Sequence, residues 1–238
     1  MNRFLKNAVL LCLAMLTSMH IGYGQYGINL FYKKSKSVEA WNQVLSEPSR
    51  NDILPNMYGF SLDYWFRIKK YRIEFLPELS YSTGDKGGLL FDDGQSGQLK
   101  WQELGFTLNT NIYLFDLLGD CNCPTFDKQN TLFKKGFYVQ ISPGVTFAQG
   151  NINASNNNVN KTNILPSLSF GAGLDIGVSK LITITPWIRY FESFLADWLS
   201  LEVYQDLPGA NHELYKTNIN GFLFGIRLGY RLDYKKRY

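Results

Sequence analysis

The segment YRIEFLPELSYS, residues 71–82, alternates in chemical character almost without a break. Its odd-numbered residues are apolar or aromatic: Tyr71, Ile73, Phe75, Pro77, Leu79 and Tyr81. Apart from Leu76, its even-numbered residues are charged or hydroxylated: Arg72, Glu74, Glu78, Ser80 and Ser82. Because successive side chains of a β-strand point to opposite faces, the segment predicts one long strand with an apolar face and an ionic face.

Seven other segments repeat this period of two: YGINLFY (26–32), YGFSLDYWFRI (58–68), ELGFTLNTNIYLF (103–115), FYVQISPGVTF (137–147), SLSFGAGLDIGV (167–178), ITITPWIRY (182–190) and GFLFGIRLGYRL (221–232). Eight strands are therefore predicted. The connections at 69–70 and 179–180 are short, whereas the intervals 34–55, 83–98, 149–165 and 192–217 are long. Such alternation is typical of an up-and-down barrel with turns at one end and loops at the other. The interval 117–136, which contains GDCNCP, takes the place of a short turn.

Strand length decides between two all-β folds. A soluble β-sandwich also alternates, but its strands average about five or six residues. The segments here run to about ten to twelve residues, the length that crosses a bilayer at a tilt. An aromatic content of 16% suits rings at lipid–water interfaces. The predicted fold is all-β, a closed antiparallel up-and-down transmembrane β-barrel of eight strands, with the sandwich as the alternative.

The N-terminus predicts a secretory signal peptide. Arg3 and Lys6 precede the apolar run AVLLCLAML, and the small-residue stretch IGYG follows. We expect cleavage after Gly24, which makes residues 1–24 the signal peptide and residues 25–238 the barrel domain. An uncleaved anchor is the alternative, although the run is shorter than the roughly 20 residues of a spanning helix. Leu11 precedes Cys12 where a lipoprotein needs a small residue, so lipidation is rejected.

Composition excludes several functions. Without residues 1–24 the chain keeps 22 basic and 20 acidic residues, a net charge of +2, which leaves no basic footprint for nucleic acid. His212 is then the only histidine, and Cys121 and Cys123 are the only cysteines. Two thiols one residue apart make a poor zinc site. An oxidising compartment outside the cytoplasm favours a disulfide between them, with an intermolecular bridge as the lesser alternative. Neither a metal nor a cofactor is predicted.

The chain from residue 25 onward resembles the small eight-stranded outer-membrane β-barrels of Gram-negative bacteria, the porin-family or OmpA-like type. The resemblance rests on the strand plan and on the last strand, GFLFGIRLGYRLDY (221–234). Gly225, Leu228 and Tyr230 match the glycine, hydrophobic and aromatic positions of the signal that the barrel-assembly machinery reads. The resemblance implies a bacterial outer-membrane location with periplasmic termini and the four long intervals outside. It also implies contact with outer-membrane lipid and lipopolysaccharide.

An eight-stranded barrel has an interior that side chains can fill. The charges with inward parity are five acids and five arginines: Asp63, Glu74, Glu78, Glu103, Asp175, Arg67, Arg72, Arg189, Arg227 and Arg231. A selective channel is expected to carry an excess of one sign, whereas a balanced set suits a salt-bridged plug. The sequence therefore favours a plugged lumen over a conducting pore, without indicating which charges pair.

Catalysis has weaker support. His212 and Glu213, with Ser193, Ser200 and Asp197, supply the residue types of a Ser-His-acid site, but a lone loop histidine is more often solvated. Glu74 and Glu78 are better explained as salt-bridged lumen residues than as a catalytic acid pair. No catalytic residue is predicted.

Three loop segments suggest contacts. FDDGQSG (91–97) and NINASNNNVNKTN (151–163) are rich in turn-forming residues, and Asp92 and Asp93 could bind a cation that bridges lipopolysaccharide, although solvated acids are favoured. ESFLADWLSLEVYQDL (192–207) allows a short amphipathic helix that caps the mouth, rests on lipid or binds a partner. The predicted function is a non-enzymatic barrel serving envelope integrity, surface interaction or a membrane complex. A narrow solute channel and a lipid-modifying enzyme are the alternatives.

Overall fold

The computed structural model describes residues 25–36, 38–46, 52–67, 71–117, 136–155, 158–179, 181–198, 201 and 216–231. The predicted signal peptide, both cysteines and His212 lie outside these residues. No helix among the described residues is long and apolar enough to cross a membrane.

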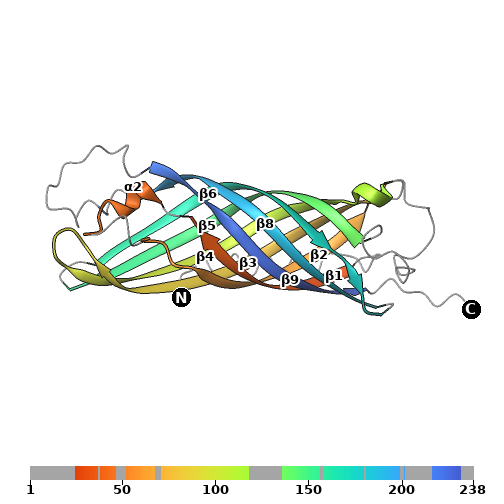
Figure 1. Cartoon of the computed structure of the whole chain (residues 1–238), viewed down its shortest axis with the longest axis horizontal. Coiled ribbons are helices and arrows are strands. Elements are labelled where there is room, and N and C mark those ends of the chain that lie inside the picture. Colours follow the sequence, from red (N-terminus) through yellow and green to blue (C-terminus); the bar gives the residue numbers. More distant parts are fainter. Residues whose placement is uncertain are drawn as a thin grey trace, which may run out of the picture.

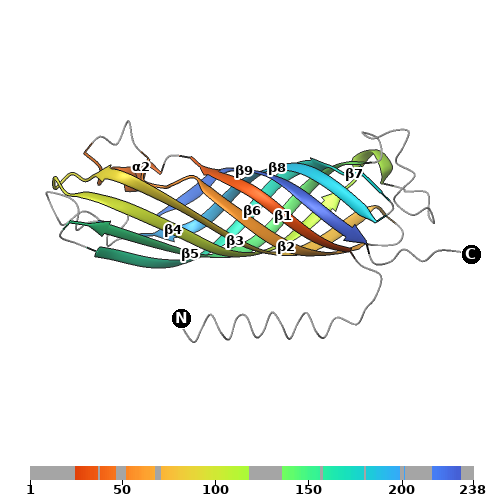
Figure 2. The ribbon, with the colours of Figure 1, turned by 90° about the horizontal axis from the view of Figure 1, so that it is seen from below.

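The described residues form a closed antiparallel β-barrel, which confirms the predicted fold (Figures 1 and 2). Eight long strands make the wall: β1 (Gln25–Ser35), β2 (Met57–Arg67), β3 (Ile73–Leu90), β4 (Ser96–Ile112), β5 (Phe137–Ala154), β6 (Asn158–Leu174), β8 (Ile182–Asp197) and β9 (Lys216–Arg231). The two-residue strand β7 (Ile176–Gly177) continues the line of β6 against β8. A short helix α2 (Glu39–Asn42) and a 3-10 turn η1 (Leu114–Asp116) complete the elements.

Each strand pairs with its neighbour in sequence, and two pairings close the ring. β1 pairs with β9, and β6 pairs with β8. One row of register partners runs round the whole barrel: Thr183, Gly229, Gly27, Asp63, Glu78, Thr107, Gly144, Ser167 and finally Ser193. The row starts on β8 at Thr183 and, after one full turn of the barrel, returns to β8 at Ser193. The shear of the barrel is therefore ten residues. This stagger makes the strands tilt steeply across the barrel axis (Figure 1).

The outer surface carries a continuous apolar belt. Eight side chains in it are each 50 to 67% exposed: Ile28, Leu30, Phe60, Leu62, Phe106, Phe170, Ile226 and Leu228. Aromatic pairs border the belt, with Tyr26 against Tyr64 toward one end and Tyr32 against Tyr58 toward the other. An apolar band flanked by aromatic girdles is the outer surface of a barrel that lipid surrounds. Soluble monomeric proteins rarely expose an apolar patch of this extent to water.

Strands β3, β4, β5, β6, β8 and β9 are longer than predicted. The intervals 83–98 and 149–165, predicted as long loops, are largely strand, because β3 reaches Leu90 and β6 begins at Asn158. The β3–β4 and β5–β6 hairpins protrude at the end of the barrel that carries α2 (Figure 1). The predicted loop 34–55 contains α2, and the N-terminal part of the predicted helix 192–207 is strand β8 instead.

The protruding part reverses the polarity of its walls. On β5, Phe147 faces outward below the transition, but Gln149 and Asn153 face outward above it. The inward positions change in the opposite sense, from Gln140 and Ser142 to the buried Ile152. A buried apolar core therefore sits inside the mouth, above a polar lumen. The predicted loops are wrong here. A strand with water outside and an apolar core inside has its apolar residues facing in, whereas a strand with lipid outside has them facing out.

Candidate functional site

The lumen holds a stack of ion pairs. In the first pair, Arg227 on β9 donates from Nε and Nη2 to the two carboxylate oxygens of Asp63 on β2, at 2.8 and 2.6 Å. Asn29 Nδ2 donates to the same carboxylate at 3.0 Å. The pair passes over β1 at Gly27, which has no side chain to obstruct it. A Cβ there would collide with Asp63 and with the Arg227 guanidinium. The bidentate geometry is the strong form of such a pair.

A second pair crosses the lumen. Arg189 Nη2 on β8 donates to Glu78 Oε2 on β3 at 3.0 Å, and Asn109 Nδ2 donates to the same oxygen. Both charged side chains are at least nine-tenths buried. The Arg189 guanidinium also lies over the Trp187 ring, 4.0 Å from its centroid. These two hydrogen bonds therefore link side chains from β3, β4 and β8 inside the lumen.

A third pair contains a lysine that the predicted ion network lacks. Lys33 Nζ on β1 lies 2.5 Å from Glu103 Oε2 on β4, and Trp101 Nε1 donates to Glu103 Oε1 at 2.9 Å. The predicted strand ended at Tyr32, one residue before Lys33. The signal was present in the sequence, because Phe31 and Lys33 continue the inward alternation of Asn29.

Toward the end of the lumen away from the mouth, one phenol hydroxyl forms hydrogen bonds with two carboxyl groups. The Tyr113 hydroxyl lies 2.8 Å from Glu74 Oε2 and 2.6 Å from Asp175 Oδ2. Thr185 Oγ1 donates to the second oxygen of Asp175 at 2.5 Å. The Arg72 guanidinium stacks on the Tyr113 ring at 4.0 Å. Glu74 and Glu78 thus have separate partners and do not form an acid pair.

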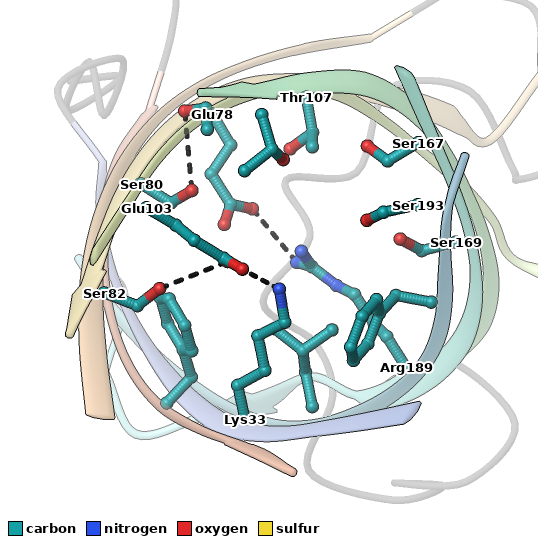
Figure 3. A pocket seen from close by; sticks show the side chains of 15 residues that line it. Lys33, Glu78, Ser80, Ser82, Glu103, Thr107, Ser167, Ser169, Arg189 and Ser193 are labelled. Atoms are coloured by element: carbon teal, nitrogen blue, oxygen red, sulfur yellow. Dashed lines mark hydrogen bonds and ion pairs between the residues drawn. The ribbon is translucent and has the colours of Figure 1, made fainter. Parts of the chain in front are cut away.

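A polar cavity of about 60 Å³ lies in the lumen, bordered by the Glu78–Arg189 and Lys33–Glu103 pairs. Lys33, Glu103, Glu78 and Arg189 line one part of it, as Figure 3 shows. Hydroxyl groups line most of the rest: Ser80, Ser82, Thr107, Thr146, Ser167, Ser169 and Ser193. Phe31, Gly105, Phe191 and Leu223 complete the wall. This volume and lining suit a few ordered water molecules, since a water needs about 10–15 Å³ and two to four polar partners.

The mouth above the cavity is packed with apolar side chains. Trp41, Trp101 and Trp198 are at most 1% exposed, and their ring centroids lie 5.4 to 5.9 Å apart. Gly150 lies directly against Trp101 and Trp198, so a side chain there would collide with both rings. A β-bulge after Ser193 brings Trp198 inward by shifting the alternation of β8 by one residue. We call this set, with Leu89, Leu99, Ile152, Leu201 and the other buried apolar residues around it, the mouth core.

The predicted lumen residues are placed unevenly. Seven are buried: Asp63, Arg72, Glu74, Glu78, Glu103, Arg189 and Arg227. Asp175 is half-buried at the break between β6 and β7. The side chains of Arg67 and Arg231 lie outside the described part, as do Cys121, Cys123 and their predicted disulfide.

Other predicted positions have structural surroundings. Ser193 lines the cavity, and Asp197 lies 3.7 Å from Lys161, while His212, Glu213 and Ser200 are outside the described residues. Asp93 accepts hydrogen bonds from Gln95 in the β3–β4 turn. Of the residues matched to the assembly signal, Leu228 and Tyr230 face outward, and Gly225 lies against the Trp187 ring. Among the described residues, no three His, Cys, Asp or Glu side chains are grouped to hold a metal ion.

No protein-family model matches the chain, and no curated protein matches it. Solved structures do align. Neisserial surface protein A has a TM-score of 0.46 and 10% identity, covering 89% of this chain and 99% of that one. The attachment invasion locus protein Ail of Yersinia pestis has a TM-score of 0.45 and 12% identity, covering 89% and 99%. OprG from Pseudomonas aeruginosa has a TM-score of 0.40 and 13% identity, covering 89% and 96%. In architecture the chain is similar to these small outer-membrane barrels.

Proposed function

We propose that this chain is a non-enzymatic outer-membrane barrel, closed to solutes, that serves at the cell surface through its protruding mouth. The observation that carries the proposal is the mouth core. A water-filled path through the barrel would have to pass three buried tryptophans that contact one another. Apolar packing of this kind excludes water and the ions that travel with it.

The charges below the mouth core support the same proposal. Asp63, Glu78 and Glu103 each have a basic partner within 3.0 Å. Each pair joins strands that are not neighbours in the ring. The Glu78–Arg189 and Lys33–Glu103 pairs reach across the lumen, and the Asp63–Arg227 pair spans β1. A pore that selects for charge would be expected to present one sign to the permeating ion.

A narrow solute channel is the second candidate, and the cavity is the observation that favours it. Its hydroxyl-rich wall could belong to a water-filled path if the mouth core and the ion pairs below it moved apart. In the closed barrel that we propose, the mouth core and the ion pairs stay packed around the cavity, and no continuous path runs through it.

The two candidates differ in permeability. The full chain should be folded into lipid vesicles, with insertion checked by resistance to SDS until heating. We expect vesicle swelling in arabinose and planar-bilayer current to match those of protein-free membranes. Steady single-channel current from the inserted barrel would contradict the closed-barrel proposal and favour the channel.

The lipid-modifying enzyme is tested separately. Expression of the chain in a bacterium with a defined lipid A should leave the mass of that lipid A unchanged. A new lipid A species that disappears in a Ser193→Ala variant would overturn the non-enzymatic proposal.

Recovery of the protein with outer membranes after fractionation would support the proposed location, and recovery as a soluble monomer without detergent would contradict it.

A further inference from the structure

The outward face of the protruding hairpins is covered by amide side chains. Six of them define what we call the amide face: Gln98, Gln149, Asn151, Asn153, Asn158 and Asn160. Register pairing places them side by side, with Asn151 opposite Asn160 and Asn153 opposite Asn158 across β5 and β6. Gln98 on β4 is the register partner of Asn153. Four of the six are on adjacent strands at successive outward positions, so they form a grid and not a scattered set.

The amide face carries little net charge. Lys100 on β4 lies within the face, opposite Asn151 on β5, and its register partner on the β3 side is Asp85, so one base has one acid beside it. Thr162, the partner of Gln149, adds a hydroxyl. Exposed surfaces of small domains are usually about a quarter to a third charged residues. The scarcity of charge disfavours binding through phosphate groups, as in nucleic acid, which would need lysine and arginine. The face therefore suits the hydroxyl groups of a sugar and not its phosphates.

Amides suit a different partner. Each Asn or Gln side chain offers two N–H donors and one carbonyl acceptor. A saccharide hydroxyl is likewise both donor and acceptor, so a planar array of amides can satisfy the hydroxyls along a sugar ring. One hydrogen bond already links neighbouring members of the array, from Gln149 Nε2 to Asn160 Oδ1 at 3.4 Å. That bond is long and exposed, so exchanging it for a bond to ligand costs little.

The face is held rigid from behind. Ala148, Ile152 and Val159 occupy inward positions of the same two strands and are buried in the mouth core. Gly150, also inward, lies against the tryptophan rings. A flat sheet backed by a packed core keeps its side chains in place before a ligand arrives, which lowers the entropic cost of binding.

The position of the amide face above the apolar belt indicates where a bound sugar would come from. Lower on β5 and β6, the outward positions Ile141 and Phe170 are 40 and 51% exposed and belong to the apolar belt. The amide face continues the same side of the same strands immediately above that belt. A lipid whose acyl chains lie against the belt therefore brings its headgroup to the level of the amides.

We propose that the amide face binds the sugar headgroups of glycolipids in the surrounding outer leaflet. The inference deepens the proposed surface role, because it depends on the protruding end facing the outer leaflet. Glycolipid headgroups packed against β4, β5 and β6 would anchor the barrel in one rotational orientation relative to its lipid neighbours.

The test uses a sugar probe without acyl chains. The full chain, folded in detergent micelles and labelled with ¹⁵N, is titrated with an oligosaccharide prepared from fully deacylated rough lipopolysaccharide and freed of its phosphate groups. We expect saturable shifts in the side-chain amide signals of Asn151 and Asn160. The Asn151→Ala/Asn160→Ala variant should bind about tenfold more weakly, because two hydrogen-bonding groups are lost. Asn218→Ala is the matched control, since Asn218 is an exposed amide on β9 outside the face, and it should leave the affinity unchanged.

Three results would overturn the proposal: no saturable shift, equal weakening in Asn218→Ala, or a sugar-independent dimer that the double variant abolishes. The dimer would assign the face to a second copy of the chain. The probe has no acyl chain and the measurement needs no membrane, so this experiment reads out separately from permeability and cell fractionation. A conducting barrel could still bind the sugar, and a closed barrel could fail to bind it.

Discussion

Glu78 and Arg189 form an ion pair across the full width of the barrel. Arg189 Nη2 lies 3.0 Å from Glu78 Oε2, and β3 and β8 stand four places apart in the ring of eight strands. The two side chains therefore bridge opposite walls and help to line the polar cavity (Figure 3). A contact of this kind both fills the lumen and holds its walls together.

Removal of one partner should destabilise the barrel without opening it. Glu78→Leu leaves the Arg189 guanidinium buried and without its carboxylate, and breaking a buried pair in this way typically costs about 3–5 kcal/mol. We expect a lower urea midpoint for the barrel in micelles and no planar-bilayer current.

Two controls separate the ion pair from general packing. Leu79→Ala changes the neighbouring residue on the lipid side and should cost less, because lipid or detergent tails refill the space. Glu78→Leu/Arg189→Leu removes both charges and should recover part of the lost stability, as a double-mutant cycle would measure. A neutral Glu78→Leu variant that passes current would show instead that the carboxylate lines a water-filled path.

Gly27 should be intolerant of even a methyl group. The Asp63–Arg227 pair crosses directly over its α-carbon, and Asn29 also holds the Asp63 carboxylate, so neither side chain is free to retreat. Gly27→Ala should lower the free energy of unfolding by about 1–3 kcal/mol, the usual cost of overpacking. Gly87→Ala is the control, because a Cβ at Gly87 meets no atom within 4 Å. Equal urea midpoints for the two variants would contradict the packing of this pair.

Adjacent leucines test the reversal of polarity in the protruding hairpin. Leu89 is 2% exposed within the mouth core, whereas Leu90 is 51% exposed on the outer side of β3. Leu89→Ala should cost about 2–5 kcal/mol, as buried leucines do. Leu90→Ala should change the free energy of unfolding by no more than about 0.5 kcal/mol. Urea midpoints in micelles give both values, and a larger loss for Leu90→Ala would place the core on the wrong face of the strand.

The belt and the lumen could be predicted from sequence because one rule governs both. Where lipid surrounds the strand, apolar residues face out and polar residues face in, so Tyr71 to Ser82 reveals its two faces directly. Above the belt water surrounds the strand, and the rule reverses. Leu99 and Trp101 on β4 already alternate with Gln98, Lys100 and Gln102, but their polarity is opposite to that of the lipid-facing strands, so the rule for the belt does not predict a strand there.

The partners of the lumen charges could not be predicted. Parity gives the direction of a side chain, but the height at which it meets the opposite wall depends on the stagger of every strand between them. With a shear of ten residues, Lys33 reaches Glu103 across three strand spacings, although the two are 70 residues apart in sequence. Strand sequences alone do not specify that stagger.

The last prediction concerns orientation. We predict that the protruding hairpins lie outside the cell and that the short turns face the periplasm. Asn153 is exposed at the end of β5, and Ser179 is exposed in the turn before β8, at opposite ends of the barrel. Each can be replaced by cysteine, Asn153→Cys or Ser179→Cys, in a chain that also carries Cys121→Ser and Cys123→Ser. A membrane-impermeant maleimide should label Asn153→Cys in intact cells and Ser179→Cys only after the outer membrane is broken. The opposite pattern would invert the topology, and it would leave the amide face in the periplasm, away from the glycolipid headgroups of the outer leaflet.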